Sequence, residues 1–181
     1  MRASNRLRAA IGLLGILVVA VPAFAACPDA DDDGYCDLNI LFARFGRNLS
    51  LIPRGKIVVA GELFTDPESG DVFDGSKSIT FTATESVGTT RLFTLQPADC
   101  ITLETGRIRC INLGNTVRGV FVPITGSPTV YRFRAKATRL DIGGAFLPPV
   151  TVTIAHEDGV SRRGVIDECR NSKKAMTCRS L

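Results

Sequence analysis

The sequence TVYRFRAKATRL, at residues 129–140, shows the clearest alternation of side chains in the chain. Tyr131, Phe133, Ala135 and Ala137 occupy alternate positions, and the residues at the three positions between them, 132, 134 and 136, are basic. Successive side chains of a β-strand point to opposite faces of a sheet. This period of two therefore predicts a strand with one buried face and one solvated face.

The same period of two continues on both sides of this stretch, with turn residues roughly every eight to twelve positions. The predicted strands occupy residues 56–64, 79–84, 92–95, 107–113, 116–122, 129–140, 150–155 and 160–166. Helical spacing does not recur between them, so no crossover helices are available to join parallel strands. The sequence predicts an all-β fold, an antiparallel immunoglobulin-like β-sandwich of about eight strands.

Upstream of these strands the spacing of apolar residues changes. Leu38, Leu41, Phe42 and Phe45 recur at i, i+3, i+4 and i+7, and a glycine follows the last of them. This spacing predicts a short amphipathic helix whose apolar stripe packs on the main domain.

The six cysteines fall into three close pairs along the sequence. The simplest connectivity is three local disulfides, Cys27–Cys36, Cys100–Cys110 and Cys169–Cys178. Spacing alone does not choose among the connectivities that six cysteines allow. Clustered cysteines can also bind zinc, but no C-x2-C pair is present.

The hairpin between Cys100 and Cys110 has two conflicting registers. A three-residue loop at residues 104–106 places the two cysteines opposite each other, but it sets apolar side chains against arginines. A two-residue loop pairs apolar residues with each other and acid with base, but it puts the cysteines on opposite faces. The sequence leaves both registers open.

The first 25 residues have the pattern of an export signal. Arg2, Arg6 and Arg8 precede an uncharged apolar run at residues 9–21, and Ala-Phe-Ala ends at Ala25. We expect cleavage after Ala25 and a secreted or periplasmic protein. The run is too short for a stable membrane span, so we expect no transmembrane span after cleavage. Removal of three arginines lowers the formal charge of +4 to +1.

A second processing route uses the first cysteine. Phe24-Ala25-Ala26-Cys27 resembles a bacterial lipobox, which implies an outer-membrane lipoprotein anchored through Cys27. Lipidation of this cysteine would leave an odd number of thiols in an oxidising compartment, which favours the free chain.

An acidic loop bounded by cysteines occupies residues 27–37. Asp29, Asp31 and Asp33 precede a glycine and fit the pattern D-x-D-x-D-G. In that pattern, carboxylates at positions 1, 3 and 5 converge on a hard cation while the glycine permits a sharp turn. The spacing therefore predicts a cation site.

This loop resembles the calcium loops of thrombospondin type 3 repeats and, more distantly, those of EF-hands and dockerins. The resemblance implies calcium bound by Asp29, Asp31, Asp33 and Asp37 and by the backbone carbonyl of Tyr35. The terminal acid of such loops is replaced by an isoleucine, so we expect weak affinity, on the order of 10⁻⁴ to 10⁻³ M. The alternative is an acidic, solvated terminal tail.

The outward positions of residues 131–139 form a basic row, Arg132, Arg134 and Lys136. Joined by Arg162 and Arg163, this row would attract an anionic glycan, a lipid head group or a nucleic acid. The alternative, which we expect, is a solvated strand face paired with acids on neighbouring strands. No nucleic-acid partner is expected, because no exposed aromatic residues interleave with the bases.

Catalytic patterns are sparse. His156 is the only histidine and shares its parity with Val152 and Ile154, which predicts a position at the rim of the core. No G-x-S-x-G elbow accompanies it. We therefore expect no enzyme, and a secreted hydrolase is the least favoured alternative.

Together these patterns predict an exported, non-enzymatic binding or structural module with a weak calcium site and an unknown extracellular or envelope partner. A lipid-anchored envelope protein with the same β-domain is the alternative. The expected organisation is a signal peptide (1–25), an acidic loop (26–37), a helix and linker (38–54), a β-sandwich domain (55–168) and a disulfide-closed tail (169–181).

Overall fold

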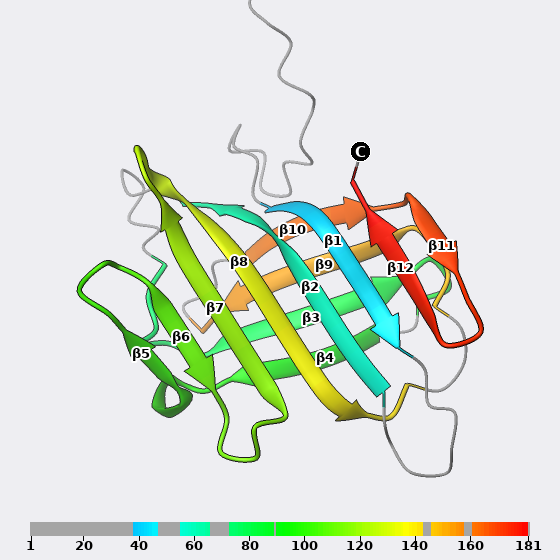
Figure 1. Cartoon of the computed structure of the whole chain (residues 1–181), viewed down its shortest axis with the longest axis horizontal. Coiled ribbons are helices and arrows are strands. Elements are labelled where there is room, and N and C mark those ends of the chain that lie inside the picture. The colour runs from blue at the N-terminus through cyan, green and yellow to red at the C-terminus, as the bar shows by residue number, and fades with distance from the viewer. Residues whose placement is uncertain are drawn as a thin grey trace, which may run out of the picture.

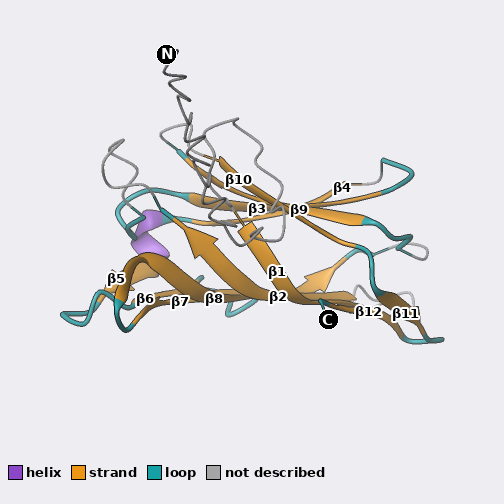
Figure 2. Ribbon diagram, turned by 90° about the horizontal axis from the view of Figure 1, so that it is seen from above, coloured by secondary structure: helices purple, strands orange, loops and turns teal. Residues whose placement is uncertain are grey.

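A computed structural model of the chain describes residues 38–46, 55–65, 73–88, 90–142, 146–157 and 161–180. Its regular elements are β-strands, apart from one 3-10 turn, η1 (Pro97–Asp99). The strands form two antiparallel sheets that lie one above the other as two layers (Figure 2). The predictions of an all-β chain and of antiparallel sheets are confirmed, and the immunoglobulin-like arrangement stays a prediction.

The larger sheet has eight strands and the smaller has four. The order in the larger sheet is β11 (Cys169–Asn171), β12 (Ala175–Arg179), β1 (Leu38–Gly46), β2 (Gly55–Phe64), β8 (Ser127–Leu140), β7 (Val117–Ile124), β6 (Ile108–Ile111) and β5 (Cys100–Thr102). The order in the smaller sheet is β10 (Ser161–Ile166), β9 (Val150–His156), β3 (Ile79–Glu85) and β4 (Thr90–Leu95). Figure 1 shows the larger sheet in front of the smaller one.

The core fills the space between the two sheets, where the inward parity of every long strand is apolar. Phe81 on β3 stacks on Phe93 of β4 with ring centroids 4.9 Å apart. Across the layers, the ring centroid of Phe81 lies 6.2 Å from the ring centroids of both Phe121 on β7 and Phe133 on β8. These phenylalanines are buried, and their burial is the main favourable contribution to joining the sheets.

The predicted helix over residues 38–45 is wrong, because this segment is strand β1. β1 pairs with β12 on one side and with β2 on the other, so both of its edges are hydrogen-bonded. A register shift between Ile40 and Phe42 adds one residue, Leu41, to the strand. Its inward positions therefore become 38, 40, 43 and 45. A β-bulge thus broke the period of two and produced spacing that imitates a helix.

The C-terminal residues form a hairpin that belongs to the larger sheet. β11 pairs with β12, and β12 then pairs with β1 from the other end of the described chain. With this hairpin the two sheets together have twelve described strands, more than the predicted count of about eight.

A disulfide joins each edge strand of the larger sheet to its neighbour. Cys100–Cys110 links β5 to β6, and Cys169–Cys178 links β11 to β12. Both edge strands are short, which limits the row of unpaired backbone groups that they expose. Two of the three predicted disulfides are confirmed, and they indicate an oxidising compartment. Cys27 and Cys36 lie outside the described residues.

The three-residue loop is the register that the hairpin adopts. Cys100 lies opposite Cys110 and Ile101 lies opposite Arg109. The outer side of this edge faces solvent, and Ile101 is 56% exposed there. The apparent conflict disappears because Ile101 does not need an apolar partner outside the core.

Candidate functional site

The outer face of the eight-stranded sheet carries many basic residues, and Figure 1 looks onto this face. Alternation along each strand turns the apolar residues toward the smaller sheet and the basic residues away from it. We call this surface the cationic face. Its basic residues are Arg44, Lys56, Arg109, Arg118, Arg132, Arg134, Lys136, Arg170 and Arg179.

Strand register aligns these residues into rows that cross the sheet. The first row, in order from β11 to β7, is Arg170, Thr177, Arg44, Val58, Lys136 and Arg118. The second row, from β12 to β6, is Arg179, Phe42, Ala60, Arg134, Val120 and Arg109. Each row spans about 24 Å at about 4.8 Å per strand, so the charges form a two-dimensional array.

Within the described strands of this sheet, acidic residues do not balance the array. Glu62 is the one acidic residue within the eight described strands of the larger sheet. Its Oε1 lies 3.4 Å from Nη2 of Arg132, and the two side chains form an ion pair. Arg134 lies opposite Ala60 and Val120, and Lys136 lies opposite Val58 and Arg118.

The expectation that acids on neighbouring strands pair with the basic row is therefore confirmed for Arg132 and wrong for Arg134 and Lys136. Their neighbours in the sheet are apolar or basic.

The positive charges influence one another. Partial desolvation lowers the pKa of Lys56, and the charges of Lys136, Arg44 and Arg134 lower it further. Two other strands, β1 and β8, supply these neighbours, so the mutual repulsion is a property of the assembled sheet. An anion bound among them would relieve this repulsion.

A shallow apolar pocket of about 440 Å³ lies within the cationic face. Its lining residues are Leu41, Ala60, Gly61, Val120, Val122, Arg132, Phe133 and Arg134. The bulge in β1 directs Leu41 outward, where it is 41% exposed. A Cβ on Gly61 would come within 2.0 Å of the backbone oxygen of Asn39, so the close approach of β1 and β2 at this bulge requires glycine.

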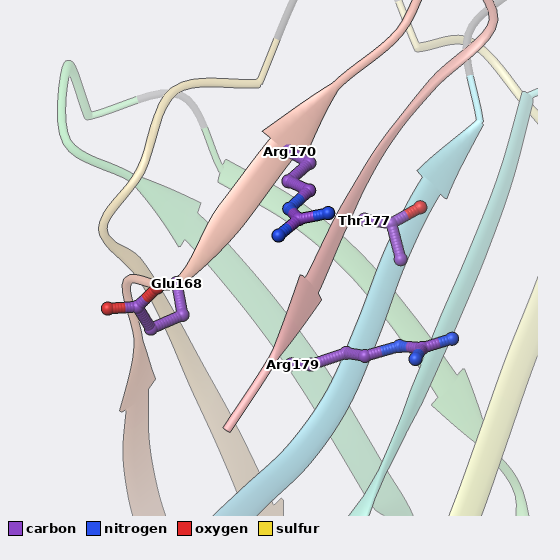
Figure 3. Close-up of a pocket in the computed structure, with 4 residues that line it drawn as sticks. All are labelled: Glu168, Arg170, Thr177 and Arg179. Atoms are coloured by element: carbon purple, nitrogen blue, oxygen red, sulfur yellow. The ribbon is translucent and has the colours of Figure 1, made fainter. Parts of the chain in front are cut away.

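A second pocket, of about 490 Å³, lies at the β11–β12 end of the same sheet. It is lined by Glu168, Arg170, Thr177 and Arg179. Figure 3 shows the Arg179 side chain extending from β12 across β1, whereas Glu168 points the other way. The two arginines therefore extend the positive charge to this edge.

The outer face of the four-stranded sheet is different in composition. Its outward positions include Thr80, Thr82, Thr84, Thr90, Thr94, Thr151 and Thr153. Hydroxyl groups of Thr80 and Thr94 lie 3.0 Å apart, and those of Thr84 and Thr90 lie 3.1 Å apart. Arg163 is the one charged residue at an outward position of these described strands. Neutral hydroxyls thus suffice to solvate a sheet of this protein, so solubility does not account for the cationic face.

Arg162 and Arg163 do not extend the basic row, contrary to the sequence-based suggestion, because β10 belongs to the other sheet. Arg162 points inward and is 1% exposed. Its Nε donates a hydrogen bond to the carbonyl oxygen of Phe64 at 2.6 Å, and its guanidinium lies 5.6 Å from the ring centroid of Phe73.

His156 is buried beside the same aromatic residue. Its ring stacks on Phe73 with centroids 4.4 Å apart, and the histidine is 4% exposed. The prediction that His156 lies with the core is confirmed. Its contact with Phe73 is a packing contact.

The predicted calcium ligands Asp29, Asp31, Asp33, Tyr35 and Asp37 lie outside the described residues. Within the described part of the chain, no group of three or more His, Cys, Asp or Glu side chains is placed to hold a metal ion. The described part of the chain also contains no helix long and apolar enough to span a membrane.

Most of the cationic face was missed by sequence reasoning, which found only the row on β8. Arg44, Arg118 and Arg179 lie far apart in the sequence, and pairing between strands brings them to one surface. The sequence did contain a signal for part of this face. Arg109 and Arg118 stand at outward-facing positions in the alternation of their own strands.

No protein-family model, curated protein or solved structure matches this chain.

Proposed function

We propose that this chain is an exported, non-enzymatic binding module that holds an extended anionic ligand on its cationic face. The observation that supports this most is the row in which Arg44, Lys136 and Arg118 align across the sheet with no acidic residue among their partners in the described strands. Like charges on adjacent strands destabilise a sheet, so their presence calls for a compensating partner. A ligand rich in phosphate, sulfate or carboxylate groups supplies that partner.

Export is part of the proposal. The signal pattern at residues 1–25 supports it, and so do the two disulfides, which persist in oxidising compartments. We also propose the calcium loop at residues 29–37 as a separate, weak site that precedes the β-domain.

A heparin-derived oligosaccharide is a suitable probe, because it carries many sulfate and carboxylate groups and no apolar chain. We expect the exported protein to bind it in calorimetry, with an affinity that falls as salt is raised because ions screen exposed charges. The triple variant Arg118→Ser, Arg134→Ser, Lys136→Ser should lose at least about tenfold in affinity.

Arg163→Ser is the matched control, because it removes an exposed arginine from the other sheet. Its affinity should stay within about twofold of the unmodified protein. Equal losses in the triple variant and the control would contradict the proposal, as would an absence of binding at low salt.

A further inference from the structure

We propose that the cationic face docks flat on an anionic lipid bilayer, with Leu41 and Val122 entering the boundary between head groups and acyl chains. This inference rests on the proposed anion-binding function and names its ligand. Three features of the surface favour a bilayer over a soluble anionic polymer.

The first feature is the shape of the charged array. A single polymer chain needs a linear track of cations, whereas this face presents parallel rows about 24 Å long on neighbouring positions of the strands. Arg134 and Lys136 belong to adjacent rows on the same strand, and the next outward residue of that strand, Arg132, is paired with Glu62. A two-dimensional array of cations matches a surface that carries anions in two dimensions.

The second feature is the apolar residues among the cations. Leu41 is 41% exposed and Val122 is 39% exposed, and both line the pocket of about 440 Å³ beside the second row. Ile101, at the β5 end of the second row, is 56% exposed. Exposed aliphatic groups contribute to binding at a membrane interface, where burial of apolar area and attraction to anionic lipids add together. A hydrophilic glycan would leave these groups without a role.

The third feature is how the cations sit on the sheet. Val58 points outward by register, yet it is only 3% exposed. Its cross-strand partners are Arg44 and Lys136, whose aliphatic stems are long enough to cover it. Long basic side chains of this kind lay their apolar stems against the sheet and extend their charged ends away from it. The charged ends can then contact the head groups of a bilayer.

The opposite surface fixes the orientation of docking. The outer face of the four-stranded sheet is lined by threonines and presents Arg163 as its one outward charge within the described strands. Attraction to anionic lipid therefore acts on one side of the sandwich, and the threonine side faces away.

Vesicle binding tests the proposal directly. Large vesicles of 30% phosphatidylglycerol in phosphatidylcholine, at about 100 mM salt, should sediment with the exported protein, and pure phosphatidylcholine vesicles should not. Arg134→Ser and Lys136→Ser should each lower the partition coefficient about fivefold, and Arg163→Ser should leave it unchanged.

An introduced tryptophan reports on depth, because the chain has none of its own. Leu41→Trp should shift its emission to shorter wavelength on anionic vesicles and be quenched by lipids brominated on the acyl chain. Leu92→Trp, at a position 60% exposed on the four-stranded sheet, should show neither change. Val122→Trp provides a second reporter on the docking side if substitution at the bulge perturbs folding.

The outcomes separate this inference from the proposed function. Binding to the heparin oligosaccharide without binding to anionic vesicles would overturn bilayer docking and leave the anion-binding function standing. Absence of binding to both would overturn both. Quenching of Leu92→Trp but not of Leu41→Trp or Val122→Trp would also overturn the inference, because the wrong face would be docked.

Discussion

Arg118 on β7 lies directly opposite Lys136 on β8, so two positive charges face each other across an antiparallel pair of strands. Arg118 is held by a hydrogen bond from its Nε to Oδ1 of Asn115 at 2.6 Å, and the strand partners of Lys136 are Arg118 and Val58. This arrangement opposes the stability of the sheet and favours the binding of an anion.

Replacing one of these charges should therefore separate stability from binding. Lys136→Glu should raise the free energy of unfolding by about 0.5 kcal/mol, because an opposite-charge pair replaces a like-charge pair on the surface. The same variant should bind the heparin oligosaccharide more weakly. Urea denaturation and calorimetry measure the two effects. Arg163→Glu, which faces Thr153, is the control and should gain no stability. Loss of stability in Lys136→Glu would contradict the account of the row.

The pKa of Lys56 should respond to ligand. Partial desolvation and then the charges of Lys136, Arg44 and Arg134 lower this pKa, so the folded state disfavours the proton. That cost is present at neutral pH and is relieved as pH rises through the lowered pKa. An anion on the cationic face should raise the pKa toward its ordinary value. NMR titration of the lysine side chain measures the change, and Lys136→Met should raise the pKa without ligand. A pKa unmoved by both would show that the charges are not coupled.

Gly61 should not tolerate a side chain. An added Cβ would lie 2.0 Å from the backbone oxygen of Asn39, which cannot move without displacing β1. Gly61→Ala should therefore cost about 2 kcal/mol of unfolding free energy and perturb the pocket beside Leu41. At Gly46, the nearest atom to an added Cβ is 3.5 Å away, so Gly46→Ala is the matched control. Similar stability of the two variants would argue against the close approach at the bulge.

The two disulfides should stabilise the edges of the larger sheet. Cys169→Ala with Cys178→Ala should lower the free energy of unfolding by about 2.5 kcal/mol, because the bridge closes a short loop in the unfolded chain. Cys100→Ala with Cys110→Ala should cost a similar amount. Denaturant titration provides the measurement. If reduction of the unmodified protein left its stability unchanged, neither bridge would contribute as expected.

The acidic loop should bind calcium weakly. Calorimetry at millimolar calcium should give heat that is lost in Asp31→Ala, because the D-x-D-x-D-G pattern needs its central carboxylates to converge on the ion. Asp167→Ala, an exposed acid of the C-terminal part, is the control. An identical response in Asp31→Ala and the unmodified protein would identify the loop as a solvated tail.

Local patterns were enough to predict many elements. The alternation in residues 129–140 predicted β8 and its buried face, and β3 and β9 followed from the same period. Loop spacing predicted Cys100–Cys110 and Cys169–Cys178. These successes share a cause, because strand parity and short loop closure depend on residues that are close in sequence.

Features that depend on distant partners were not predictable in this way. β1 was mistaken for a helix because the bulge at Leu41 breaks its alternation, and pairing with β12 and β2 decides its conformation. The hairpin register stayed ambiguous until its outer side was known to face solvent, where Ile101 is tolerated.

Taken alone, the order of amino acids determined which residues face inward in strands with unbroken alternation, where the cysteines can close loops, and that β8 carries a basic row. The order of strands in the sheet decided the rest. It set Arg118 beside Lys136, aligned Arg44 and Arg170 with them, and left Glu62 as the single acid within those described strands. Parity is a property of one strand, whereas a charged surface arises only when hydrogen bonding aligns strands that are remote in the chain.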